Sequence, residues 1–286
     1  MSIDRSVALG AELPIQRFTW SANDVQTYHL AIGAGANPLD PTELRYLDDE
    51  KPQVLPTFAV VAATFHATEA PRVHFPGIDI DLAKVVHGSQ EVHVLAPVPA
   101  TGEAETTTRI TEIWDKGSAA VIVQEATTRA PDGTELWRTR SSIFARGEGG
   151  FGGERGPSTK SAPPTRAPDA DAVVRILPQQ ALMYRMCGDR NPLHSDPTFA
   201  SAAGFSRPIL HGLCTYGMVA KAVTDTLLGG DADALRSIAA RFAGVVYPGE
   251  SLECRFWRED DRIDIAVTIP GRGDAPALAD VVATIR

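Results

Sequence analysis

The segment PILHGLCTYGMVAKAVTDTLL, residues 208–228, decides the fold of this 286-residue chain. We expect a helix over residues 209–228, because Pro208 suits a first helical turn and Gly229-Gly230 suits the end of a helix. The segment is apolar on most faces, so this helix should be buried. Its apolar run is broken by His211, Lys221 and Asp225. The pattern therefore predicts a core helix rather than a membrane span.

Strands are predicted after this helix and also in the first half of the chain. Residues 262–269 alternate between polar and apolar side chains, as do residues 252–256, which is typical of strands with one buried face. In the first half, strands are expected over 119–128 and 136–145, joined by a turn at Pro131-Asp132-Gly133. A helix followed by an antiparallel sheet, in each half, predicts an α+β fold with the sheet wrapped around the helix.

A segment rich in glycine and proline separates the two halves. Residues 147–172 contain six glycines and four prolines, which favours a linker that does not order itself by burying apolar area. We therefore expect three parts: a first half of residues 1–146, the linker 147–172, and a second half of residues 173–286. The length alone also fits two domains.

Short matches in the same order suggest that the halves are copies of one unit. Asn37-Pro38-Leu39 matches Asn191-Pro192-Leu193 at an offset of 191 − 37 = 154 residues. At this offset Asp189 falls on Gly35 and His194 falls on Asp40. The first copy keeps the turn but lacks both chemical groups, so we expect the chemistry in the second half.

Composition excludes several classes of protein. There are 27 basic and 36 acidic residues, a net charge of −9, and no basic run, so we expect no nucleic-acid partner. The three cysteines show no Cys-x-x-Cys pair, which suits a reducing compartment and argues against structural zinc. Residues 1–14 lack the apolar core of a signal peptide. We expect a cytoplasmic protein.

The densest polar cluster is GDRNPLHSDP, residues 188–197. Pro192 and Pro197 prevent a continuous helix, so Asp189 and His194 should lie on a turn, where a carboxylate and an imidazole can share one water and move its protons. Gly212 belongs to the first turn of the predicted helix. Its N–H has no intrahelical acceptor and can bind a developing oxyanion.

These residues resemble a known family. The pattern Tyr184-x-x-x-Gly-Asp-x-Asn-Pro-Leu-His-x-Asp-Pro197, followed by RPILHGL at 207–213, resembles the motif of the MaoC-like, (R)-specific enoyl-CoA hydratases of hydratase 2 type. The resemblance implies a double hot-dog fold whose degenerate first copy accommodates a long acyl tail, which fits the apolar Leu55–Val61 segment. It implies reversible hydration of trans-2-enoyl-CoA to (R)-3-hydroxyacyl-CoA, without metal or redox cofactor, coenzyme A being part of the substrate.

The motif also implies roles for individual residues. Asp189 and His194 would be the catalytic pair, and Gly212 would supply the oxyanion-hole N–H. Further candidates for supporting the turn or contacting the substrate are Asn191, Arg207, His211 and Tyr184. We expect Asp196 to cap the short helix after Pro197. His87 and His93 flank a strand-like run and receive no role.

Four alternatives stay open at this point. The protein could be a dehydratase acting on acyl-carrier-protein thioesters, a non-catalytic acyl-thioester-binding protein, or a hot-dog thioesterase. His194-Ser195-Asp196 is also an H-x-D pair, and an iron site would need one more histidine; His211 is only 17 residues further on, too near for the long crossover that such oxygenases need. The partner is expected to be an acyl-CoA thioester. Because hot-dog sheets often pair at their edges, a homodimer is a further expectation.

Overall fold

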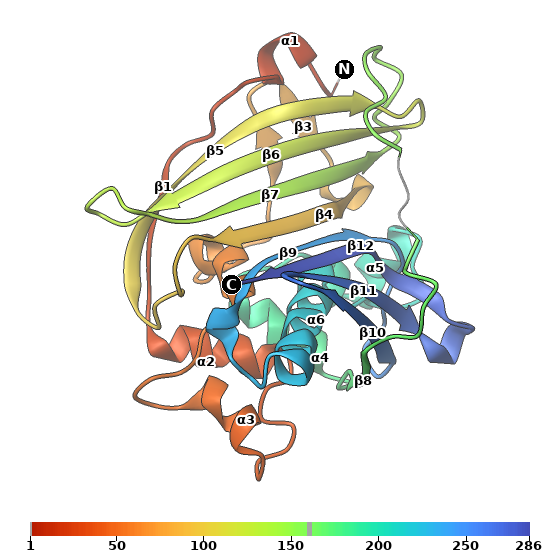
Figure 1. The fold of residues 1–286 in the computed structure, drawn as a ribbon. Coiled ribbons are helices and arrows are strands. Elements are labelled where there is room, and N and C mark those ends of the chain that lie inside the picture. The colour runs from red at the N-terminus through yellow and green to blue at the C-terminus, as the bar shows by residue number, and fades with distance from the viewer. Residues whose placement is uncertain (1, 159–161) are drawn as a thin grey trace.

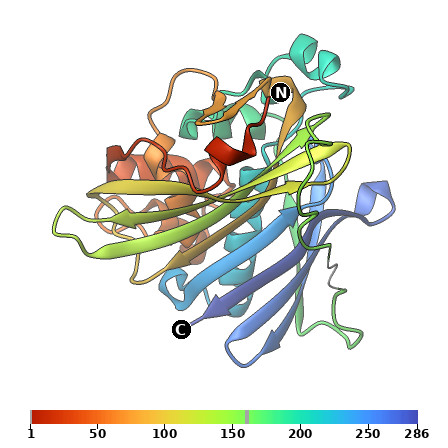
Figure 2. The same cartoon turned by 90° about the horizontal axis from the view of Figure 1, so that it is seen from above.

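One antiparallel sheet runs through the whole molecule in the computed structural model, which describes residues 2–158 and 162–286 (Figures 1 and 2). The first half contributes β1 (Gln16–Trp20), β5 (Gly102–Asp115), β6 (Ala119–Arg129), β7 (Glu135–Arg146) and β4 (Val85–Val94) in that spatial order. The second half continues it with β9 (Leu235–Phe242), β12 (Ala275–Ile285), β11 (Arg262–Ile269), β10 (Ser251–Glu259) and β8 (Ala170–Arg175). The halves join where β4 pairs antiparallel with β9.

The helices lie against one side of this sheet (Figure 2). They are α1 (Arg5–Ala8), α2 (Ala22–Ala31), α3 (Pro41–Leu44), α4 (Gln180–Tyr184), α5 (Pro197–Ala202) and α6 (Gly212–Leu227). A small hairpin of β2 (Val73–Phe75) and β3 (Ile78–Ile80) forms a separate sheet. Every residue from Cys214 to Thr224 in α6 is buried, which is why this helix forms the centre of the second half.

The α+β double hot-dog prediction is confirmed, and so are most predicted strands. β11 has the predicted bounds, with Ile263, Ile265, Val267 and Ile269 on its buried face. β6 is one residue longer than expected at its C-terminal end, and β7 is one residue longer at each end. Period-two alternation was a sufficient signal here because one face of each strand packs on the core.

The predicted start of the central helix is wrong by three residues. α6 begins at Gly212, with His211 as its N-cap residue. The preceding residues are held in extended backbone: the Ile209 N–H donates to the Leu193 carbonyl at 3.3 Å and the Leu210 N–H to the Val246 carbonyl at 2.8 Å. These tertiary hydrogen bonds compete with the first helical turn. Pro208 therefore precedes the helix instead of opening it.

The first half does not contain the long apolar helix that the fold prediction placed in each copy. Its apolar segment forms two short 3-10 helices, Pro56–Val60 and Ala62–Thr64. Leu55 and Phe58 are fully buried there and belong to the same core cluster as α6. One core is therefore shared between the two halves.

The linker is also more ordered than predicted. β8 starts at Ala170, three residues before the expected boundary, and the Asp115 carboxylate accepts hydrogen bonds from the Gly150 and Gly152 N–H groups at 2.9 and 2.7 Å. The order comes from hydrogen bonds to the sheet together with packing of Phe151 against a core cluster of the first half. Residues 159–161 of the predicted linker lie outside the described residues.

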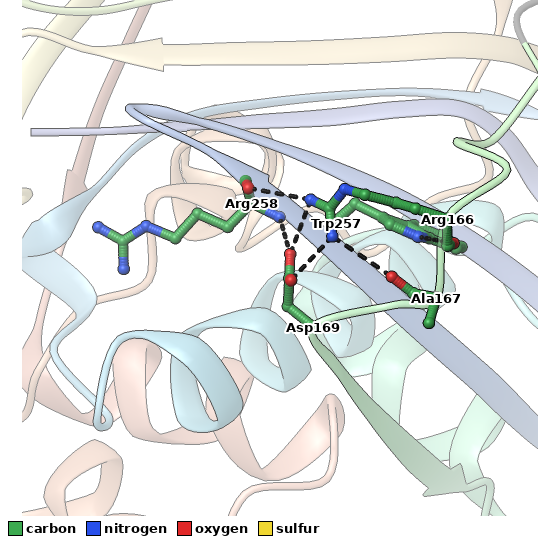
Figure 3. A network of polar contacts seen from close by, with 5 residues as sticks. All are labelled: Arg166, Ala167, Asp169, Trp257 and Arg258. Atoms are coloured by element: carbon green, nitrogen blue, oxygen red, sulfur yellow. Dashed lines mark hydrogen bonds and ion pairs between the residues drawn. The ribbon is translucent and has the colours of Figure 1, made fainter.

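The far end of the linker is attached to β10 (Figure 3). Arg166 makes an ion pair with Asp169 at 2.8 Å, and the Asp169 carboxylate accepts from the Arg258 N–H at 2.7 Å. The Trp257 indole N–H donates to the Arg166 carbonyl at 2.8 Å. The chain therefore enters β8 from a fixed point at the edge of the sheet.

A buried ion cluster ties α6 to the first half. The Lys221 ammonium lies 2.8 Å from Glu43 and 2.7 Å from Asp225, and the Tyr46 hydroxyl donates to Asp225 at 2.7 Å. The charged Lys221 is accommodated in a buried helix because Glu43 and Asp225 both lie close enough to form ion pairs with it. Within the described residues, no helix has the length and hydropathy to cross a membrane.

Replacing Lys221 by Met should lower the free energy of unfolding by about 3 kcal/mol, because it removes the buried cation that two partly buried carboxylates, Glu43 and Asp225, share. Urea denaturation of the variant measures this loss. The matched control is Arg17→Met, which breaks an exposed pair with Glu105 and should change stability by less than about 1 kcal/mol. A Lys221→Met protein as stable as the wild type would contradict the assigned role.

Candidate active site

A cavity of about 610 Å³ opens between the two halves. The second half lines it with Asp189, Asn191, His194, Leu210 and Gly212. The first half lines it with residues of β4, β6 and β7, including Val85, His87, Gln124 and Ile143. The polar groups named by the sequence therefore meet at one end of a mostly apolar space that both halves enclose.

The turn that carries Asp189 is fixed by local hydrogen bonds. Gly188 has a left-handed backbone with φ of 102°, and an added Cβ would lie 1.9 Å from the Thr64 carbonyl oxygen, so only glycine fits. The Asp189 carboxylate accepts from the Asn191 N–H at 3.1 Å, and the Asn191 side chain accepts from the Leu193 N–H at 3.0 Å. Asn191 thus holds the turn and also lines the cavity.

His194 is held in one tautomer. Its Nδ1 lies 2.9 Å from the Ile209 carbonyl oxygen, which can only accept, so Nδ1 carries the proton and Nε2 keeps a free lone pair. Burial lowers the pKa of His194 below its usual value, and the negative charge of Asp189 opposes this shift. His194 is therefore neutral at pH 7 and available as a base.

His211 and Tyr184 lie behind the catalytic turn rather than in the cavity lining. The His211 ring stacks on His194 with centroids 3.7 Å apart, and its Nε2 donates to the Asp189 carbonyl at 3.3 Å. Tyr184 packs on the other side of His211, 5.0 Å between centroids. Neither residue lines the cavity, so contact of these two residues with the substrate stays a prediction. They support His194 and the Asp189 backbone.

Arg207 does not reach the cavity either. It is exposed, and its guanidinium lies over the Tyr247 ring at 4.6 Å from the centroid. Asp196 caps α5, as expected: its carboxylate accepts from the Thr198 N–H at 2.8 Å. Among the described residues, Asp196 does not come together with His194 and a second histidine as a group of three potential ligands, which an iron site built on the H-x-D pair would need.

A different set of three potential metal ligands does come together in the structure. Ligand atoms of Asp189, His194 and His211 lie within 4.8 Å of one another. The two imidazole rings, however, are stacked with an interplanar angle of 26°. Nearly parallel rings direct their lone pairs side by side instead of toward one point, which does not suit two ligands of a single ion.

The equivalent turn of the first half corrects one residue of the repeat alignment. Asn37 accepts from the Leu39 N–H at 3.2 Å, as Asn191 does from Leu193, and Asp40 accepts from the Thr42 N–H at 2.8 Å, as Asp196 does from Thr198. Asp40 therefore corresponds to Asp196 and not to His194. The first copy lacks the two residues equivalent to His194 and Ser195.

The first half lines the cavity through residues other than the predicted Leu55–Val61 segment. Leu55–Val61, assigned to the acyl tail, does not line it, because these residues pack into the shared core. His87 does line it, beside Asp189, although no role was given to it. No motif marks His87. The available signal was a histidine in an otherwise half-buried strand.

Comparison with known families divides the chain as the repeats do. Residues 18–147 match the MFE-2 hydratase 2 N-terminal domain, and residues 159–273 match the MaoC like domain.

Similar proteins share nearly the whole length. The chain is 59% identical over 281 residues to the enoyl-CoA hydratase ChsH3 of Mycobacterium tuberculosis, covering 98% of both chains. It is 38% identical to the peroxisomal enoyl-CoA hydratase 2 of Arabidopsis thaliana, covering 89% of this chain and 87% of the other. A crystal structure of a MaoC-like dehydratase from Phytophthora capsici superimposes with a TM-score of 0.83 at 27% identity, covering 99% and 98%. With the same fold and the same two domains, the chain belongs to the MaoC-like, hydratase 2 type family of double hot-dog proteins.

Proposed function

We propose that this protein is a hydro-lyase that reversibly hydrates trans-2-enoyl-CoA to (R)-3-hydroxyacyl-CoA in fatty acid metabolism. The observation that carries the proposal is the placement of Asp189, His194 and Gly212 at one end of an apolar cavity. The enoyl-CoA hydratases named above support it, since they are similar over most of their length.

The geometry suggests how the chain would perform this reaction. One water lies between the Asp189 carboxylate and His194 Nε2, both of which can accept its protons. Its oxygen adds to C3 of the enoyl group, and the pair delivers a proton to C2, so the elements of one water are divided between the two carbons. The Gly212 N–H donates to the thioester oxygen as negative charge develops there.

The apolar lining of the cavity indicates where the acyl chain would lie. The acyl chain extends toward the first half, along apolar residues that include Val73, Phe75, Val85 and Ile143.

The reaction needs neither a metal nor a redox cofactor. The proposed setting is the cytoplasm, with acyl-CoA as the partner and a homodimer as the assembly. An acyl-carrier-protein thioester is the alternative substrate, and the ratio of rates on the two thioesters distinguishes them.

Asp189→Asn and His194→Gln should each lower kcat for hydration by about 100- to 10,000-fold, because each removes one proton-transfer group. Loss of enoyl absorbance measures the rate on enoyl-CoAs of increasing chain length, and chiral analysis identifies the product. Asp196→Asn is the matched control: asparagine also caps a helix, so this variant should keep wild-type activity.

Four results would contradict the proposal. Full activity in Asp189→Asn or His194→Gln would show that the replaced residue is not catalytic. An (S)-3-hydroxyacyl-CoA product would contradict the proposed (R) stereochemistry. Binding of enoyl-CoA without loss of absorbance would favour a binding protein. Release of free thiol would favour a thioesterase.

The acid limb of kcat/KM should lie below pH 6.5, the ordinary value for histidine, because burial lowers the pKa of His194. Activity is then full at pH 7 and falls only as His194 becomes protonated. The unfolded chain binds more protons than the folded one below pH 6.5, so stability also decreases on acidification, and a denaturation curve at each pH separates the two effects. If kcat/KM of the folded protein began to fall already above pH 6.5, the statement that burial lowers the pKa of His194 would be contradicted.

A further inference from the structure

His87 belongs to the first half but faces the catalytic residues of the second. It lies on β4 and lines the cavity together with Asp189 and Gly212. The pairing of β4 with β7 changes register between His87 and Ser89, as in a β-bulge. Bulges redirect side chains and are common beside active sites. The irregularity thus accounts for a polar side chain directed into an apolar cavity.

The imidazole of His87 is buried and incompletely paired. Its Nε2 is inaccessible to solvent and has no hydrogen-bond partner in the described part of the chain. Burial lowers its pKa to about 4, although the charge of Asp189 opposes the shift, so the ring is neutral at pH 7. A buried polar atom left unpaired is unfavourable, and such atoms in folded proteins usually have a partner.

The ring also lies next to the proposed oxyanion site. His87 packs against Phe242 with centroids 4.8 Å apart. An added Cβ on Gly212 would come within 2.9 Å of the same Phe242 ring. Phe242 therefore contacts both the His87 ring and the first residue of α6. His87 lines the same cavity as Asp189 and Gly212.

His87 is one of three such groups around this cavity. Gln124 Nε2 on β6 and Thr215 Oγ1 on α6 are also buried without partners among the described residues, and both side chains line the same space. Unpaired polar atoms from both halves converge on one volume. A ligand that carries oxygen atoms at this position would satisfy them together.

We propose that His87, in its neutral form, binds substrate by a hydrogen bond from Nε2–H to an oxygen at the reacting end of the acyl thioester. This rests on the proposed function. It makes the first half a participant in substrate binding, although it lacks the Asp/His pair. The expected partner is the thioester carbonyl or the 3-hydroxyl oxygen, since both lie at the end of the acyl group held near Asp189 and Gly212.

Two substitutions of His87 separate binding from structure. His87→Leu removes the donor, whereas His87→Gln keeps an amide N–H near the position of Nε2. We expect kcat/KM for hydration of crotonyl-CoA, and affinity for the unreactive hexanoyl-CoA measured by calorimetry, to fall about tenfold in the Leu variant, as for one lost hydrogen bond. The Gln variant should stay within about threefold of wild type. His93→Leu, on the same strand but outside the cavity lining, should change neither quantity.

The outcomes distinguish this proposal from the function on which it rests. If Leu and Gln variants are equally impaired, or if the Leu variant equals wild type, His87 does not bind substrate through Nε2. If wild-type protein binds hexanoyl-CoA but does not hydrate crotonyl-CoA, the proposed function fails, and the calorimetric comparison still decides the role of His87. If wild-type protein does not bind hexanoyl-CoA, both proposals fail. Thermal unfolding of each variant should match wild type, because the Nε2 contact is with ligand.

Discussion

Burial of α6 on every side is the constraint on which the rest of the molecule depends. A helix without a polar face must be covered all round, and a single curved sheet covers only part of it. β8, β9 and β10 pack on one part of α6, and the first half's 3-10 helix Pro56–Val60 packs on another. The two halves therefore form one core, and the pairing of β4 with β9 extends one sheet across both. Lys221 can remain charged in this helix because Glu43, from the first half, approaches it.

The same constraint places the catalytic groups. Once α6 is fixed, its first residue, Gly212, lies at the end of the cavity, and the extended residues before it present the Ile209 carbonyl to His194. That hydrogen bond selects the tautomer. Stacking on His211 then holds the ring, and His211 in turn bonds to the Asp189 backbone. The acid–base pair is therefore oriented by the helix N-terminus and its approach segment, both of which are set by core packing.

What could be predicted from the sequence depended on whether local chemistry decided the structure. The strand at 262–269 and the Asp196 cap follow from alternation and side-chain type, so both were predicted. The turn that carries the candidate pair was predicted because Asp189, Asn191 and His194 occur within six residues of one another. The start of α6 was missed, since hydrogen bonds from Ile209 and Leu210 to distant residues decide it. His87 was missed for a similar reason: its role depends on a sheet partnership and on a cavity formed by residues far apart in the chain.

A sequence comparison of the two copies shows that the first copy lacks the candidate catalytic side chains. The same comparison does not show which side chains of the first copy line the cavity. The first copy keeps the Asn-Pro-Leu turn and the Asp-Pro-Thr cap, and a short alignment shows that both chemical groups of the pair are missing. The hydrogen bonds of the turn show further that the residues equivalent to His194 and Ser195 are absent. Its contribution to the cavity comes from β4, β6 and β7, where single side chains such as His87 and Gln124 point inward without any shared spacing. Its apolar segment forms short 3-10 helices instead of a long helix like α6. A copy with no catalytic pair of its own can therefore still determine how the substrate lies, because one sheet brings its strands to the other copy's catalytic turn.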